Sequence, residues 1–125
     1  SRAAYAEAAD RVCSDVDEEL HDREVELWTA AAGEGDGPEA DLYVERRERW
    51  VRVEVVPAYR DMDNRLRKIR APEDDRTYLD DIYDDLRRLT DELHNRPSQG
   101  RDLIREDPEV RSRFEGYGMK VCGRV

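Results

Sequence analysis

Apolar residues in this 125-residue chain recur at three- and four-residue steps, and this periodicity constrains the fold more than any other feature of the sequence. Such spacing stacks side chains on one stripe of an α-helix. The first stripe lies in residues 3–30 and consists of Tyr5, Ala9, Val12, Val16, Leu20 and Leu27. Because 43% of the residues are charged and 38% are hydrophobic, a chain without these stripes would approach the composition of disordered proteins. The pattern therefore predicts an all-α fold.

A second helix is expected over residues 38–70, after the glycine-rich segment 33–37 has interrupted the first. Residues 51–55 also alternate with the two-residue period of a β-strand. The helical periodicity continues on both sides of them, and acid–arginine pairs recur at four-residue spacing, so a helix is favoured. Its core stripe is Val44, Val51, Val55, Tyr59, Met62, Leu66 and Ile69, and the pairs are Glu45/Arg49, Glu48/Arg52, Asp61/Arg65 and Asp63/Arg67. Because Pro57 has no N–H, the sequence predicts a kink at residues 53–56.

Two further helical segments complete the expected fold. A helix over residues 73–95 begins with three acids, which suit the positive end of a helix dipole. Residues 107–108 combine an aspartate cap with a proline at the first helical position, and Gly116 or Gly118 should end that last helix. Their core residues are Tyr78, Leu79, Ile82, Leu86, Leu89, Leu93, Val110, Phe114 and Tyr117. We therefore expect one domain, residues 1–125, folded as a four-helix up-and-down bundle with a kinked second helix.

Cys13 and Cys122 lie near opposite ends of the chain. The first helix and the C-terminal segment are neighbours in a closed four-helix bundle, so a disulfide between these cysteines requires no unusual chain path. Closing so long a loop would contribute about 4 to 5 kcal/mol in the chain-entropy model. Two buried free thiols are the alternative. A disulfide predicts an oxidising, extracytoplasmic location.

Both cysteines belong to short segments that carry a resemblance. Residues 4–13 read AYAEAADRVC and residues 117–123 read YGMKVCG. In this layout the chain resembles a group of actinobacterial extracytoplasmic domains of unknown function, lipoprotein-like or membrane-anchored, that end in Tyr-Gly-x-x-x-Cys-Gly. Lysine occurs only at positions 68 and 120 while arginine is abundant, which favours a GC-rich genome of the same kind. The resemblance implies an extracytoplasmic location, the disulfide and a helical fold, and it transfers no catalytic residue.

Charge limits the partners that this chain is expected to have. The formal net charge is -10, and most arginines alternate with acids, which disfavours binding to nucleic acid or to anionic lipid. No segment is long and apolar enough to cross a membrane. Because the chain opens at Ser1 rather than at a methionine, we expect an upstream signal or anchor in the parent protein, and membrane association only through it.

Metal binding is the best candidate for chemistry. Carboxylate-bridged di-iron bundles use Glu-x-x-His pairs that point into the core, and this chain contains Glu18-x-x-His21 and Asp91-x-x-His94. At about 100° per residue, all four side chains face away from the core stripes. No Asp or Glu lies squarely on a core stripe, no serine has a histidine placed beside it, and no glycine loop follows a strand. We therefore expect no metal, cofactor or catalytic residue, and an enzyme is not favoured.

A second apolar side of the 38–70 helix is the most function-like feature. Leu42, Trp50, Val53 and Val56 fall off its core stripe, and a helix that is apolar on two sides needs two partners. The second side could be covered by the glycine-rich loop with Trp28, by a protein partner such as a second copy, or by a small molecule. The sequence thus favours an extracytoplasmic interaction or sensing module without catalytic activity, possible as a homodimer. A carboxylate-rich metal-binding bundle, either carrier or enzyme, is the alternative.

Overall fold

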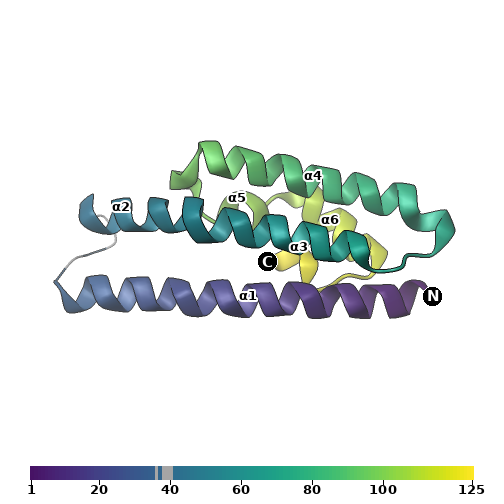
Figure 1. The fold of residues 1–125 in the computed structure, drawn as a ribbon, viewed down its shortest axis with the longest axis horizontal. Helices are drawn as coiled ribbons and strands as arrows, with labels where there is room; N and C mark the ends of the chain where they lie inside the picture. The colour runs from purple at the N-terminus through teal and green to yellow at the C-terminus, as the bar shows by residue number, and fades with distance from the viewer. Residues whose placement is uncertain (36, 38–40) are drawn as a thin grey trace.

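The structure of this protein is a computed structural model that describes residues 1–35, 37 and 41–125, and those residues contain helices and turns but no strand (Figure 1). The prediction of an all-α fold is confirmed. Helix α1 comprises Arg2–Gly33 and begins where the Ser1 hydroxyl accepts a hydrogen bond from the Ala4 N–H at 3.2 Å. It is slightly longer than the predicted helix at both ends.

A single rod follows, formed by α2 (Asp41–Trp50), a π-helical turn (Val51–Val55) and α3 (Val56–Lys68). The expected start of this helix at residue 38 lies outside the described residues. Helical geometry through residues 51–55 excludes the strand alternative. The predicted kink at residues 53–56 stays a prediction. What the structure contains at this point is a π-helical turn. There the Val56 N–H donates to the Val51 carbonyl, five residues earlier.

This π turn corrects the predicted core stripe. Before it, the buried side chains are those of Tyr43 and Trp50, and Val44 is only half-buried. After it, burial continues from Val55 in the predicted phase. The wide turn contains one residue more than an α-helical turn, so apolar residues on two neighbouring faces of the rod both reach the core. Val56 is therefore buried together with the predicted Val55.

The remaining helices are α4 (Arg76–Asn95), the short α5 (Asp102–Arg105) and α6 (Pro108–Tyr117). As predicted, Asp107 caps α6, accepting from the Val110 N–H at 3.0 Å. Gly118, in the left-handed conformation at φ 106°, ends the helix. A last 3-10 turn, Cys122–Arg124, follows.

Three rods in alternating direction dominate the molecule: α1, the α2–α3 rod and α4 (Figure 1). The α2–α3 rod lies between the other two and packs against both. Helix α6 packs on α4, while the turn Cys122–Arg124 packs on α1, so the C-terminal part of the chain closes the side that α1 and α4 leave open. All of these elements contribute to one hydrophobic cluster, whose largest fully buried members include Tyr59, Tyr83 and Phe114.

Candidate functional site

The five residues predicted as an interface separate into two groups. Trp50 and Val56 are only 5% and 1% exposed, so they belong to the core and their placement on an outer apolar side is wrong. The π turn is the reason, since it carries both residues toward α1 and α4. Trp28, Leu42 and Val53 remain exposed, Val53 to 61%.

Three exposed residues of α2 and one of the π turn form a face of mixed character, the α2 face, which consists of Leu42, Arg46, Arg49 and Val53. Their spacing of four, three and four residues places them on one side of the rod. Arg46 forms an ion pair with Glu34 at 3.0 Å. Trp28 lies across the seam from α2, where its ring meets that of Tyr43 edge to face at a centroid distance of 5.6 Å.

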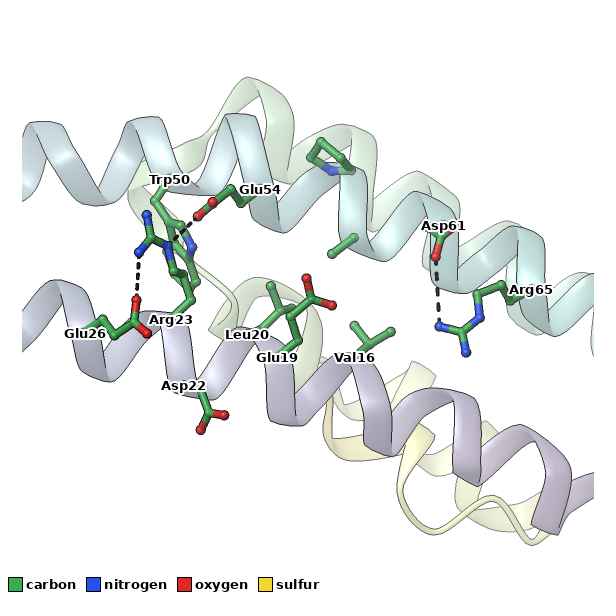
Figure 2. A pocket seen from close by; sticks show the side chains of 12 residues that line it. Val16, Glu19, Leu20, Asp22, Arg23, Glu26, Trp50, Glu54, Asp61 and Arg65 are labelled. Atoms are coloured by element: carbon green, nitrogen blue, oxygen red, sulfur yellow. Dashed lines mark hydrogen bonds and ion pairs between the residues drawn. The ribbon is translucent and has the colours of Figure 1, made fainter.

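A groove of about 570 Å³ lies between α1 and the α2–α3 rod (Figure 2). Its floor is apolar and its rim is charged, and we call it the seam groove. The floor and rim consist of Val16, Leu20, Trp50, Pro57 and Ala58, with Glu19, Asp22, Arg23, Glu26, Glu54, Asp61 and Arg65. Trp50 is therefore not part of an outer interface, but its buried side chain lines one end of the seam groove.

Solvent-exposed ion pairs cross the seam groove and link its two walls. Arg23 donates from Nη1 to Glu26 at 2.7 Å and from Nε to Glu54, on the opposite rod, at 3.1 Å. At the other end Arg65 of α3 reaches Asp15 of α1 at 3.7 Å. A smaller hollow of about 220 Å³, lined by Leu27, Arg46, Arg49 and Val53 among others, lies on the far side of the Arg23–Glu54 pair.

A carboxylate lies in the core, contrary to expectation. Asp63 is 3% exposed and accepts hydrogen bonds from Arg67 Nε at 3.0 Å and from Arg87 Nη2 at 2.8 Å. The Asp63/Arg67 pair was predicted from its spacing, but Arg87 comes from α4, and its arrival depends on how the helices pack. The two guanidinium groups balance the charge of this carboxylate and occupy its oxygens, which suits a structural role.

An arginine is buried in the same manner. Arg101, at the start of α5, is 3% exposed and donates from Nη2 to Asp17 at 2.8 Å, while its Nη1 lies 3.7 Å from Glu24. Its Nε points to the Tyr59 hydroxyl, which itself donates to the Val125 carbonyl at 2.8 Å. Arg101 therefore ties α5, α1, α3 and the last residue together, and nothing in its local sequence indicated this.

Tyrosines concentrate near the beginning of α1. The hydroxyls of Tyr5 and Tyr83 share a hydrogen bond, and burial raises the pKa of both phenols. The Tyr117 hydroxyl donates a hydrogen bond to Asp75 at 2.8 Å. Burial is the larger cause and this hydrogen bond the next, and together they raise the pKa of Tyr117 to about 12. Hydrogen bonds from Arg2 and then from Tyr117 lower the pKa of Asp75. These phenols stay protonated at neutral pH and act as buried hydrogen-bond donors.

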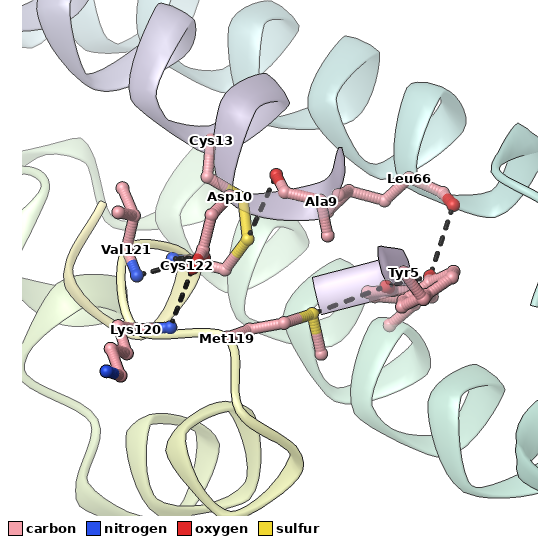
Figure 3. The surroundings of a disulfide bond; sticks show 10 residues. Tyr5, Ala9, Asp10, Cys13, Leu66, Met119, Lys120, Val121 and Cys122 are labelled. Carbon is pink, nitrogen blue, oxygen red and sulfur yellow. Dashed lines mark hydrogen bonds between the residues drawn. A yellow bond between two sulfur atoms is a disulfide. The ribbon is translucent and has the colours of Figure 1, made fainter. Parts of the chain in front are cut away.

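The predicted disulfide is present, and it joins the C-terminal turn to α1 (Figure 3). Cys13 and Cys122 are both buried. One helical turn before Cys13, the Asp10 carboxylate accepts the backbone N–H groups of Lys120, Val121 and Cys122 at 3.0, 2.9 and 3.1 Å. Because residues three apart share a helix face, Asp10 and Cys13 hold the same turn, once through hydrogen bonds and once covalently.

The two acid–histidine pairs lie where the helical angles placed them. Glu18, His21, Asp91 and His94 are all exposed. Among the described residues, no cluster of three or more His, Cys, Asp or Glu side chains has a geometry suited to a metal ion. None of the described helices combines the length and the apolar character needed to span a bilayer.

Comparisons of the chain with protein-family models, with curated proteins and with solved structures found no match.

Proposed function

We propose that this chain is a non-catalytic binding module that works outside the cytoplasm and that uses the seam groove as its binding site. The observation that carries the proposal is the groove itself: an apolar floor and a charged rim between two long helices. Its volume lies within the range of about 300 to 1,000 Å³ typical of ligand sites. Helices α1 and α3, which form its walls, pack against each other, and the ion pairs of Arg23 and Arg65 link them across the groove.

Binding rather than catalysis is supported by the roles of the buried polar groups. Asp63 is held between two arginines, and Tyr83 is hydrogen-bonded inside the core. Groups engaged in this way hold the fold together. The seam groove, in contrast, presents carboxylates and an apolar surface to the solvent, a combination that can hold a ligand through charge and apolar contact.

The disulfide supports the extracytoplasmic location. Disulfides of this kind persist in oxidising compartments and are rare where thiol reductants are abundant. Kinship with the actinobacterial extracytoplasmic domains that end in Tyr-Gly-x-x-x-Cys-Gly is part of the same proposal, as is the assignment to four-helix up-and-down bundles. In that assignment α1, the α2–α3 rod and α4 are three of the four members, and α5 with α6 takes the place of the fourth.

Site-specific photocrosslinking in the producing cell tests the function. A photoreactive amino acid is placed at Ala58, on the groove floor, and at Glu18, which is exposed on α1 outside the groove. We expect a covalent adduct from position 58 and none from position 18. Fractionation and thiol alkylation of the same cells should show the protein outside the cytoplasm with both cysteines oxidised. Absence of an adduct from position 58 overturns the binding role, and reduced cysteines overturn the location.

A further inference from the structure

We propose that the seam groove binds a basic peptide segment, with a lysine or arginine side chain among its carboxylates and a peptide carbonyl on the indole N–H of Trp50. The proposal rests on the proposed function and specifies its ligand class. Three features of the groove carry it: a surplus of carboxylates, an apolar floor, and a buried hydrogen-bond donor that has no acceptor.

Carboxylates outnumber guanidinium groups on the rim. The groove is lined by five acids, Glu19, Asp22, Glu26, Glu54 and Asp61, and by two arginines. Both arginines are already engaged: Arg23 with Glu26 and Glu54, and Arg65 with Asp15 and Asp61. The remaining negative charge is therefore free to attract a cation, and the net charge of -10 on the whole chain adds long-range attraction.

Glu19 is the carboxylate best placed to receive that cation. Within the described part of the chain it has no ion-pair partner. Figure 2 shows its carboxylate in the space between α1 and α3, whereas Asp22 turns toward the outer side of α1. The apolar side chains below Glu19, Val16 and Leu20, can take the methylene stem of a lysine or arginine while the charged head stays at the rim.

Trp50 supplies the second contact. Its side chain is almost fully buried, and its Nε1 finds no hydrogen-bond acceptor among the residues that the structure describes. Figure 2 shows the ring reaching from α2 toward α1 at one end of the groove, with its nitrogen on the groove side. A buried donor without an acceptor is unfavourable, so a ligand oxygen that reaches it is bound preferentially.

These two contacts together select a peptide over a simple cation. The rim requires a positively charged donor, and Trp50 requires an acceptor. A basic residue in a peptide offers both, because it carries a charged head at the end of its side chain and a carbonyl in its backbone. A polyamine offers only the charge, and an acidic or neutral peptide offers only the carbonyl.

The test is a titration of the whole ¹⁵N-labelled chain with an acetylated, amidated tetralysine peptide, followed through the indole N–H resonances in NMR spectra. Trp28 provides an internal reference, and Trp28→Phe assigns the two signals. We expect the Trp50 signal to shift saturably, Trp28 to move little, and the affinity to fall as salt is added. Tetraglutamate should leave the Trp50 signal in place.

Two matched variants locate the charge. Glu19→Gln removes the carboxylate in the groove, and Glu18→Gln removes the neighbouring carboxylate outside it. We expect Glu19→Gln to weaken tetralysine binding by about three- to tenfold and Glu18→Gln by less than about twofold. Equal weakening by both variants would reduce the effect to general charge attraction and overturn the proposal.

Spermine separates a peptide site from a polyamine site. It carries the charges of tetralysine without a carbonyl, so we expect weaker binding and no hydrogen-bond shift of the Trp50 resonance. Equal affinity and an equal shift overturn the peptide assignment, as does a Trp50 signal that tetralysine leaves unmoved. If position 58 still yields photoadducts in cells after such a result, the binding role stands and only the ligand class is wrong.

Discussion

Removal of the disulfide should reveal how strongly this chain depends on its C-terminal turn. The change is Cys13→Ala with Cys122→Ala, chosen because both positions are buried and serine would leave a buried hydroxyl. The cysteines are 109 residues apart. In the chain-entropy model a loop of that length stabilises the folded state by about 5 kcal/mol at 25 °C. Small domains have total stabilities of about 5 to 15 kcal/mol, so the variant should lie near the limit of folding.

The same loss can be expressed as a melting temperature. At about 2.1 cal/mol/K per residue, the unfolding entropy of a chain of this length is about 0.26 kcal/mol/K, so Tm should fall by about 15 to 20 °C. Calorimetry and urea unfolding monitored by circular dichroism measure both quantities. Dithiothreitol added to the wild-type chain should reproduce the effect once the buried bond is reduced.

Asp10→Asn is the matched control, because it weakens the hydrogen bonds to the same turn without opening the covalent loop. It should cost about 1 to 3 kcal/mol. A double-alanine variant that loses less than about 1 kcal/mol would refute the reasoning. The turn would then be held by Asp10 and its packing, and loop closure would not be the source of stability.

Three other perturbations address other parts of the molecule. Asp63→Asn leaves Arg67 and Arg87 without their shared anion and should cost about 2 to 3 kcal/mol in urea unfolding, whereas Asp84→Asn, at the exposed partner of Arg67, should cost less than about 1 kcal/mol. The pKa of Tyr117 is raised to about 12, so its protonated form stabilises the fold fully below the ordinary pKa of 10.0, and this stabilisation is lost as pH rises toward 12. Tyrosinate absorbance and alkaline unfolding should show this loss. Tyr117→Phe should remove that part of the pH dependence. If a second copy docks on the α2 face, Leu42→Lys with Val53→Lys should lower the mass measured by sedimentation while the fold persists. An unchanged oligomeric mass would contradict that interface. Trp50→Asp is expected to unfold the chain instead, because Trp50 is buried in the core.

Helix positions could be predicted from the sequence because they depend on local information. The stripe of α1 and that of α4 repeat at helical spacing over several turns, and most of their residues are buried as expected. Val12 and Leu27 are only partly buried, and the prediction of Tyr78 as a core residue is wrong, because its ring stacks on that of Tyr117 near the surface and stays 42% exposed. Capping of α6 by Asp107 could also be predicted, since the aspartate, the proline after it and the N–H that it caps lie within four residues. The disulfide followed from the closed arrangement expected for the helices, and the resemblance carried by the two end segments implied it as well.

The π turn was not predicted, and its effect on the candidate site was large. One additional residue between Trp50 and Val55 changes which face of α2 is buried. Helical periodicity assumes a constant angle per residue, so Trp50 and Val56 were predicted to lie outside the core. Nothing in the hydrophobic pattern distinguishes a second apolar side from a register shift that buries both sides.

Buried charge was also beyond local reasoning. Asp63 and Arg101 lie in the interior because partners from distant helices, Arg87 for the first and Asp17 for the second, meet them there. A charged residue looks like a surface residue until its counter-ion is known, and the counter-ion comes from another part of the chain.

The order of residues along the chain was thus enough to predict the helices, the cap of α6 and, as the favoured alternative, the pairing of the cysteines, since each depends on short-range periodicity or on simple chain closure. The seam groove, the acceptor-free indole of Trp50 and the buried ion pairs arose only when separate helices packed together. Their geometry depends on the relative position of α1 and the α2–α3 rod. Helix propensities, caps and apolar stripes within a single helix do not determine that position.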